Sequence, residues 1–320
     1  MAPVDLNVLH PGSGPRPVLL GMAGDSASGK STLSQGIEYI LGTDRVARLC
    51  TDDYHRFDRA TRAELDVTPL DPAVNDIEVL EDHLRDLSLG RTVVKPFYDH
   101  ANGTFGPKQE FAPAEILIVE GLLALTSRGV RDSLTVAVYL DPEETLRRAW
   151  KAERDVVQRG YTPQQVQAEL ARREADAEAF VRPQAGFADI VVRFHPERVE
   201  GRTALAARLV VRPTLPYPGL RELIGSLRRR GEEPIRWSTA TDKRGPMSVL
   251  DIDGECPADL GGELEDVIWS YLHPDERLQR DMIGIVTSPD GSQRRSEALA
   301  LAQLLIVSHL VGALDGSFEM

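Results

Sequence analysis

Cysteine is scarce in this chain of 320 residues, which contains only Cys50 and Cys256. Two cysteines so far apart in the sequence do not make a disulfide framework, so we expect the protein to work in a reducing cytoplasm. Positive charge is also in deficit, because 37 Lys and Arg residues stand against 50 Asp and Glu residues, a formal net charge of −13. This balance argues against nucleic acid or an anionic membrane as the main partner.

Long apolar runs are missing as well. The most apolar stretch near the carboxyl end, residues 298–311, is shorter than a membrane span and contains Gln303, Ser308 and His309, so it predicts a buried or interface helix. Residues 1–17 contain no apolar core flanked by basic residues, and we expect no signal peptide there. With 42% hydrophobic and 27% charged residues, the composition is that of an ordinary globular protein, and no membrane partner is expected.

The most specific motif is residues 24–31, GDSASGKS, which fits the phosphate-binding loop pattern G-x-x-x-x-G-K-[ST]. An apolar run at 18–22 precedes it, and residues 32–41 follow with apolar side chains at helical spacing. A strand, a glycine loop and a helix in this order turn backbone N–H groups toward a phosphate chain. Lys30 supplies a charge for the outer phosphates, and the Ser31 hydroxyl is suited to bind Mg²⁺. The predicted nucleotide-binding residues are Gly24, Asp25, Ser26, Ala27, Ser28, Gly29, Lys30, Ser31 and Thr32.

Strand and helix patterns alternate around this loop. Apolar runs predict strands at 46–50, 116–121, 135–140, 190–194 and 205–211, and helical spacing with capping residues predicts helices at 77–87, 144–159 and 162–179. Residues 56–75 are polar and interrupted by prolines, and 93–106 are expected to form a loop or hairpin. The alternation predicts an α/β fold with a doubly wound, mostly parallel sheet.

The chain divides into three parts by composition. We expect a flexible tail (1–15), a phosphate-loop core (16–212) and a C-terminal α+β extension (213–320), in which a strand at 247–252 is followed by two or three helices. Prolines at 213, 216 and 218 mark the start of the extension. The sequence leaves open whether this extension is a separate domain or adds layers to the same sheet.

A second polar cluster, DDYHRFDR at residues 52–59, follows the predicted strand 46–50. Open parallel sheets bind ligands at the carboxyl ends of their strands, so this cluster should lie beside the phosphate loop. A kinase that acts on a hydroxyl needs a carboxylate to accept its proton, and Asp52 is suited to that role. His55 and Arg59 could hold an anionic end of the acceptor. The alternative is a solvated, turn-rich acidic segment.

A third cluster lies on the predicted helix 144–159. Lys151, Asp155 and Arg159 are spaced by four residues, and Arg154 lies beside Asp155. This spacing is also typical of an ordinary surface helix with ion pairs. A phosphoryl-transfer site, however, needs cations over the transferred group, often on a closing lid.

Together, these clusters resemble the phosphoribulokinase and uridine kinase family over residues 16–212, and the phosphoribulokinases more closely. The resemblance rests on 24–31, on 52–55 with Arg59, on 70–72 with 75–76, on 95–100 with Gly103, on 120–122, and on Arg154 and Asp155 with Arg159 and Gly160. It implies an ATP- and Mg²⁺-dependent kinase that converts a pentulose phosphate, ribulose 5-phosphate, to a bisphosphate.

The resemblance also implies residue roles. Asp52 would be the general base, and the acceptor would be bound by His55 and Arg59 and bordered by Tyr98 and His100. Lys30, Arg154 and Lys151 would stabilise the transferred group, and Arg159 would contact phosphate. Ser31, Glu120 and Asp155 would organise Mg²⁺. We expect a homo-oligomer, with a dimer as the simplest form.

Two departures from the family pattern bear on function. Phosphoribulokinases commonly have His where this chain has Leu123, so a nucleoside kinase, another sugar-phosphate kinase or a non-catalytic nucleotide-binding regulator remain alternatives. Photosynthetic relatives carry a redox cysteine in the phosphate loop, where this chain has Ser28. A lone Cys50 cannot close that bridge, so we predict no thiol switch of this kind.

Overall fold

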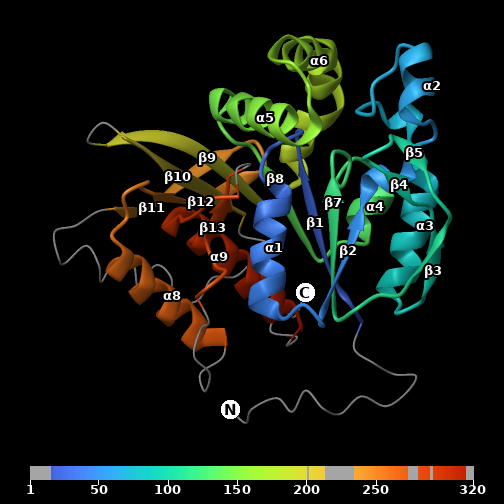
Figure 1. Ribbon diagram of the computed structural model, residues 1–320. Coiled ribbons are helices and arrows are strands. Elements are labelled where there is room, and N and C mark those ends of the chain that lie inside the picture. Colours follow the sequence, from blue (N-terminus) through green and yellow to red (C-terminus); the bar gives the residue numbers. More distant parts are fainter. Residues whose placement is uncertain (1–15, 200–201, 213–233, 273–279, 289–290, 315–320) are drawn as a thin grey trace.

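The computed structural model describes residues 16–199, 202–212, 234–272, 280–288 and 291–314. At its centre is an eight-stranded sheet with the order β11-β12-β10-β9-β8-β1-β7-β2 (Figure 1). The sheet passes through the middle of the molecule, with helices on both faces. The predicted tail, 1–15, lies outside the described residues.

Five neighbouring strands are parallel: β2 (Val46–Cys50), β7 (Ile116–Gly121), β1 (Val18–Gly24), β8 (Val136–Leu140) and β9 (Ile190–Val199). Every residue of β1 and β8 is buried, as is every residue of β7 except Glu120. Strands buried on both faces read as continuous apolar runs rather than as an alternating pattern. The predicted α/β fold with a mostly parallel sheet is therefore confirmed.

Three antiparallel neighbours extend the sheet beyond β9. They are β10 (Arg202–Val211), β12 (Gly245–Ile252) and β11 (Ile235–Asp242). β12 contains the strand predicted at 247–252, and it pairs directly with β10 of the core. The described residues of the C-terminal region therefore continue the central sheet.

Helices cover the two faces of the sheet as separate apolar layers. One layer packs α1 (Lys30–Leu41), α8 (Ala258–Leu272) and α9 (Glu297–Leu314) against the sheet, and the other packs α3 (Ile77–Ser88) and α4 (Arg128–Asp132). α9 is the one helix in the described residues that is long and apolar enough to cross a membrane, but 72% of its most apolar window is buried inside the molecule. The prediction of a buried helix at 298–311 is confirmed, and its contact with α1 links the C-terminal region to the phosphate loop.

Two further helices stand above the carboxyl ends of the strands (Figure 1). α5 (Glu144–Arg159) ends at Gly160, which adopts a left-handed φ of 70°. α6 (Pro163–Asp176) begins with a capping box between Thr162 and Gln165 and continues as a π-helical turn, Ala177–Val181, and a 3₁₀ segment, Arg182–Phe187. Both helices follow the predicted bounds closely.

Short elements occupy the stretches expected to be irregular. A 3₁₀ turn (Thr51–Tyr54) and α2 (Arg59–Glu64) follow β2, and a second 3₁₀ turn covers Pro72–Val74. Residues 93–111 form two small hairpin pairs, β3 (Val93–Lys95) with β6 (Gln109–Phe111) and β4 (Tyr98–Asp99) with β5 (Thr104–Phe105). Near the carboxyl end, β13 (Ile285–Thr287) pairs with β14 (Gln293–Arg295).

Candidate active site

The phosphate loop joins β1 to α1 and is shaped for an anion. Gly24 and Gly29 adopt φ values of 154° and 93°, and a Cβ on Gly24 would lie 2.7 Å from the backbone oxygen of Leu140. α1 begins after Gly29, with no side-chain cap and no acidic residue in its first turn. The first N–H groups of a helix have no partner within the helix, and here no capping side chain takes them. The loop therefore fits a phosphate chain.

Lys30 lies folded over this loop. Its Nζ donates to the backbone oxygens of Gly24 at 2.7 Å and Asp25 at 2.9 Å. Burial lowers the pKa of Lys30, while Asp52, Asp25 and Glu120 act in the opposite direction. Asp52 is the first of these carboxylates in order of effect, so the predicted base and the phosphate-binding lysine share one site.

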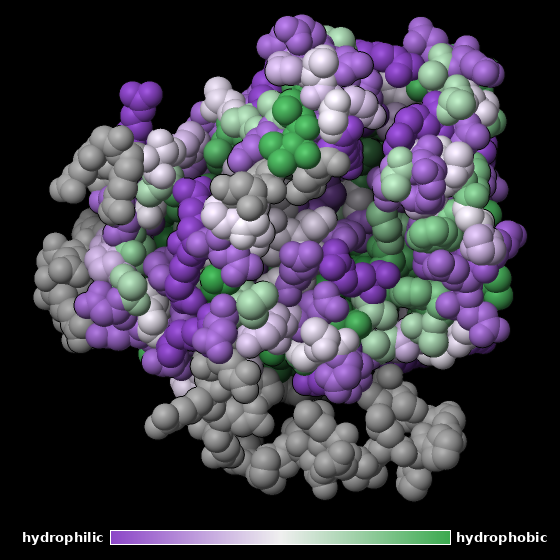
Figure 2. All heavy atoms as spheres, viewed as in Figure 1, coloured by the Kyte–Doolittle hydropathy of each residue, from purple (hydrophilic) through white to green (hydrophobic). Residues whose placement is uncertain are grey.

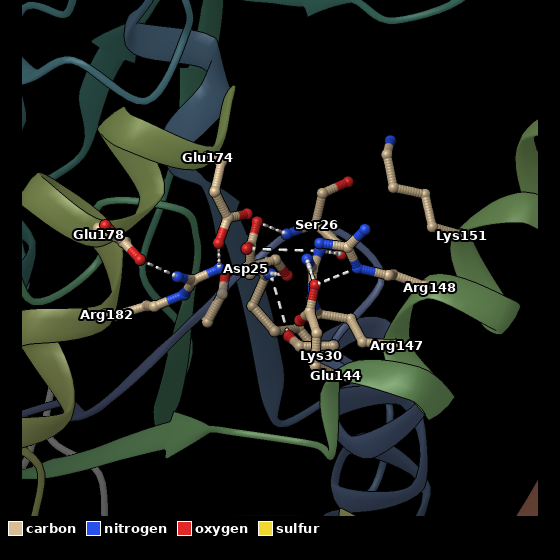
Figure 3. A network of polar contacts seen from close by, with 12 residues as sticks. Asp25, Ser26, Lys30, Glu144, Arg147, Arg148, Lys151, Glu174, Glu178 and Arg182 are labelled. Atoms are coloured by element: carbon tan, nitrogen blue, oxygen red, sulfur yellow. Dashed lines mark hydrogen bonds and ion pairs between the residues drawn. The ribbon is translucent and has the colours of Figure 1, made fainter. Parts of the chain in front are cut away.

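Two arginines of α5, Arg147 and Arg154, contact the other side of the loop, and Figure 3 shows Arg147 near Ser26 and Asp25. Arg147 donates from NH1 to the Ser26 backbone oxygen at 3.1 Å and lies 3.3 Å from Asp25 Oδ2. Arg154 donates from NH2 to Ser26 Oγ at 3.2 Å. Arg147 was not predicted. Its spacing from Lys151 and Arg154, four and seven residues, places all three on one helix face, and this was the available signal.

Asp155 is surrounded by cations. Its carboxylate accepts from Lys151 Nζ at 2.7 Å and from Arg154 Nε at 2.9 Å, and lies 3.3 Å from Arg159 NH1. The Asp155 side chain is only 3% exposed. This arrangement counts against the predicted role of Asp155 as a Mg²⁺ ligand, because its oxygens are already paired. We reassign Asp155 to holding the lid cations in place.

Lys151 also differs from its predicted role. Its side chain is 3% exposed and pairs with Asp155, and Figure 3 shows it pointing away from Lys30. Burial lowers the pKa of Lys151, against the effect of Asp155. Of the predicted cations on α5, Arg154 is therefore the one that reaches the loop, and Arg159 remains beside Asp155 with 46% of its side chain exposed.

The two neighbouring acids after β2 have different surroundings. Asp53 is buried, with one oxygen accepting from Lys95 Nζ at 2.5 Å and the other from the backbone N–H of Tyr98 at 2.9 Å. The Asp52 side chain is 23% exposed, and its Oδ2 lies 3.7 Å from His100 Nε2. Asp53 thus anchors the hairpin at β4, while Asp52 stays accessible beside the loop.

The predicted acceptor residues gather around the ring of Tyr98. His55 and His100 meet this ring edge to face, at centroid distances of 5.0 and 5.2 Å. Arg59 donates from NH2 to the backbone oxygen of His100 at 2.7 Å. The structure thus brings Asp52, His55, Arg59, Tyr98 and His100 together, although their chemical roles stay predictions.

Two residues that support this group were not predicted as site residues. Asn75 Oδ1 accepts a hydrogen bond from His55 Nδ1 at 2.6 Å, and burial lowers the pKa of His55. A buried imidazole of lowered pKa is suited to hydrogen bonding rather than to charge pairing. Arg62 is buried and donates to the Tyr98 hydroxyl at 2.7 Å. The polar segment 56–75 gave no periodic signal for either residue.

Glu120 lies at the end of β7, next to the first turn of α1. Its two oxygens accept from Ser34 Oγ at 3.0 Å and from Arg48 NH2 at 2.5 Å. Ser34 Oγ also donates to the backbone oxygen of Ser31 at 3.2 Å. The Ser31 hydroxyl at this end of the loop is an oxygen ligand of the kind that Mg²⁺ prefers. Both oxygens of Glu120 are already paired, as are those of Asp155, so the predicted role of Glu120 at the metal requires it to exchange one of these partners.

Leu123, the departure from the family pattern, is packed in an apolar cluster. It is 2% exposed and lies with Leu70, Leu122, Ala177 and Val181. This cluster joins the segment after β7 to the π-helical turn that follows α6. A leucine at this position is thus accounted for by packing.

Comparisons with known proteins give a consistent result. The sequence model of the phosphoribulokinase/uridine kinase family matches residues 19–199. The chain is 35% identical over 184 residues to a phosphoribulokinase of Synechocystis sp., covering 58% of this chain and 55% of that protein. It is 32% identical over 222 residues to the chloroplastic phosphoribulokinase of Arabidopsis thaliana, covering 62% and 56%. The chain spans about half the length of these curated phosphoribulokinases.

A uridine kinase and a solved phosphoribulokinase structure are also similar to this chain. A uridine kinase of Macrococcus caseolyticus is 34% identical over 178 residues, covering 54% of this chain and 86% of that protein. The solved structure of a phosphoribulokinase from Rhodobacter spheroides superposes with a TM-score of 0.53 at 18% identity, covering 73% of this chain and 90% of that one, which supports the fold alone. The matched region contains β1, the phosphate loop and the clusters at Asp52 and Arg154. The chain belongs to the phosphoribulokinase/uridine kinase family.

Proposed function

We propose that this chain is an ATP-dependent kinase that phosphorylates a hydroxyl of a pentulose phosphate, converting ribulose 5-phosphate to ribulose 1,5-bisphosphate. The observation that carries the proposal is that the two neighbouring acids after β2, Asp52 and Asp53, have different surroundings. Asp53 is committed to Lys95 and Tyr98, while Asp52 is accessible between the phosphate loop and the Tyr98 group.

The reaction needs little covalent chemistry from the protein. Asp52 accepts the proton of the acceptor hydroxyl as the hydroxyl oxygen attacks the terminal phosphorus of ATP, and ADP leaves. Lys30 and Arg154 offset charge on the transferred group from two sides of the loop. Mg²⁺, bound by Ser31 with Glu120 nearby, would neutralise phosphate charge. Asp155 keeps Arg154 and Arg159 oriented.

An anionic acceptor is favoured by the cations on the Asp52 side of the site. Arg59 and Arg62 both border the Tyr98 group in a chain whose net charge is −13. A local cluster of arginines is what an anionic substrate needs against an acidic background. A neutral nucleoside would give these guanidinium groups no charged partner.

An acceptor screen tests the proposal. ADP release is measured with Mg²⁺-ATP and, in turn, ribulose 5-phosphate, its pentose phosphate isomers and uridine. We expect turnover to depend on ribulose 5-phosphate. Faster turnover of uridine would favour a nucleoside kinase, and tight ATP binding without turnover of any acceptor would favour a nucleotide-binding regulator.

A further inference from the structure

Three side chains with different donor atoms meet beside the phosphate loop. Cys50 is the last residue of β2, Asp52 lies in the following 3₁₀ turn, and His100 lies in the turn between β4 and β5. One ligand atom of each, the thiol sulfur, a carboxylate oxygen and a ring nitrogen, lies within 4.8 Å of the other two. Two distant chain segments, which together contribute three different ligand types, form a more specific cluster than neighbouring acids on one loop.

The spacing fits a tetrahedral metal ion. In such a site, bonds of roughly 2.0–2.3 Å place ligand atoms about 3.3–3.8 Å apart. The pair formed by His100 Nε2 and Asp52 Oδ2 is already at 3.7 Å. The side chain of His100 is 50% exposed, so it can rotate toward Cys50 without disturbing the core.

We propose that Cys50, Asp52 and His100 bind a zinc-class divalent cation, and that this ion inhibits the kinase by occupying the general base. The inhibitory part rests on the proposed function, whereas the site itself does not. Thiolate and imidazole ligands select zinc-class ions, while Mg²⁺ prefers oxygen. The ion is therefore chemically distinct from the Mg²⁺ of the reaction.

Binding has a defined chemical balance. The thiol of Cys50 gives its proton to solvent as the sulfur bonds to the ion, and the carboxylate of Asp52 and the neutral imidazole of His100 donate lone pairs. Three protein ligands leave a fourth position for water, as in sites that exchange their metal.

The consequence for catalysis follows from geometry. An ion on Asp52 removes the lone pair that would accept the acceptor proton. Its charge also opposes Lys30, which lies in the field of the same carboxylate. Inhibition should therefore compete with the acceptor, and saturating Mg²⁺-ATP should not relieve it.

Cobalt(II) provides a direct probe of the site. The full-length protein, kept reduced with a phosphine, is titrated with Co²⁺ in the absence of nucleotide. We expect a thiolate-to-cobalt absorption band in the wild-type protein. Cys50→Ser should lose the band, and the matched control Cys256→Ser should keep it, because Cys256 lies between β12 and α8, near the opposite end of the sheet from β2.

Inhibition by Zn²⁺ is then measured on the same three proteins at saturating Mg²⁺-ATP. Cys50→Ser should keep the basal rate and raise the zinc concentration for half-inhibition by about tenfold or more, since even an outer-shell change costs about 10–100-fold in metal affinity. A band or zinc sensitivity that survives Cys50→Ser would overturn the site. A cobalt band without inhibition by Zn²⁺ would overturn the proposed effect on Asp52. The cobalt spectrum tests the metal site even if no acceptor is found, because it needs no turnover.

Discussion

At the scale of single residues, the site is decided by which charged groups are already paired. Asp52 and Asp53 are adjacent and chemically identical, yet only Asp53 is tied to Lys95 and to the Tyr98 backbone. Asp155 illustrates the same principle, since three cations use its oxygens. The partners of Asp53 are 42 and 45 residues away, so its pairing could not be read from the local motif. The three cations around Asp155, in contrast, lie within four residues of it.

Arg59 gives a residue-scale prediction. Its guanidinium lies beside the Tyr98 group and is held by the His100 backbone oxygen. Arg59→Ala should raise the KM for ribulose 5-phosphate about tenfold or more, because a charge-assisted hydrogen bond contributes about 1.5–3 kcal/mol, while the KM for ATP changes little. Arg85→Ala, on the exposed face of α3, is the matched control. An unchanged acceptor KM in Arg59→Ala would contradict the role.

At the scale of elements, α5 is the helix that supplies cations to the phosphate loop. Its contacts come from Arg147 and Arg154 on one face, while Arg148 on another face pairs with Glu144. The surface over α5 in Figure 2 is otherwise mixed, with a small apolar area among hydrophilic residues; the exposed apolar residues of α5 include Val156 and Val157. α5 thus directs Arg147 and Arg154 toward the loop, while Arg148 lies on an exposed face.

Substitution on two faces of α5 tests this division. Arg154→Ala should lower kcat by about 10²-fold, the cost typical of removing one preorganised electrostatic donor. Arg148→Ala should stay near the wild-type rate, because the described contact of its guanidinium is with Glu144 and not with the phosphate loop. Steady-state rates at saturating ATP and acceptor compare the two. Equal losses would show that the helix acts through general stability instead.

The buried helix α9 gives a prediction on pH. His309 is 1% exposed, and burial lowers its pKa to about 3, whereas an imidazole in the unfolded chain titrates near 6.5. Below pH 6.5 the unfolded chain binds a proton that the folded chain does not, so stability is full above pH 6.5 and falls as the pH decreases. The loss should reach about 2 kcal/mol at pH 5.

Urea unfolding of the wild-type protein and of His309→Leu at pH 7.5 and pH 5 checks this expectation. The difference in unfolding free energy between the two proteins should change with pH by that amount, because their other titrating groups are the same. Parallel pH dependence in the two proteins would mean that His309 is not the titrating group.

At the scale of the whole molecule, the sequence was most informative where burial is uniform. β1, β7 and β8 were predicted because strands inside a parallel sheet are continuously apolar, and α5 and α6 because Gly160 and Thr162 end and start them. α2 was missed, and the pairs β3–β6 and β4–β5 were expected only as a loop or hairpin at 93–106. They are short, and contacts such as Arg59 with Gly103 and Asp53 with Lys95 hold them in place.

The site shows the same contrast between features that are local in the sequence and features that depend on distant contacts. The phosphate loop and the residues around Asp52 and Arg154 were found from spacing alone, since each cluster is local in sequence. Arg147 was missed although its spacing from Lys151 and Arg154 was available, because its contact with Ser26, 121 residues away, appears only in the fold. The sequence also did not predict where the C-terminal region lies, because its strands join the sheet only through the pairing of β12 with β10.

The central claim is that Asp52 accepts the proton of a sugar-phosphate hydroxyl at this loop. The most direct measurement compares ribulose 5-phosphate-dependent ADP release and ATP affinity in the wild-type protein and in Asp52→Asn. We predict turnover lowered about 10²–10⁴-fold with ATP affinity retained, as expected for the loss of a general base. Near-normal turnover in Asp52→Asn would contradict the account.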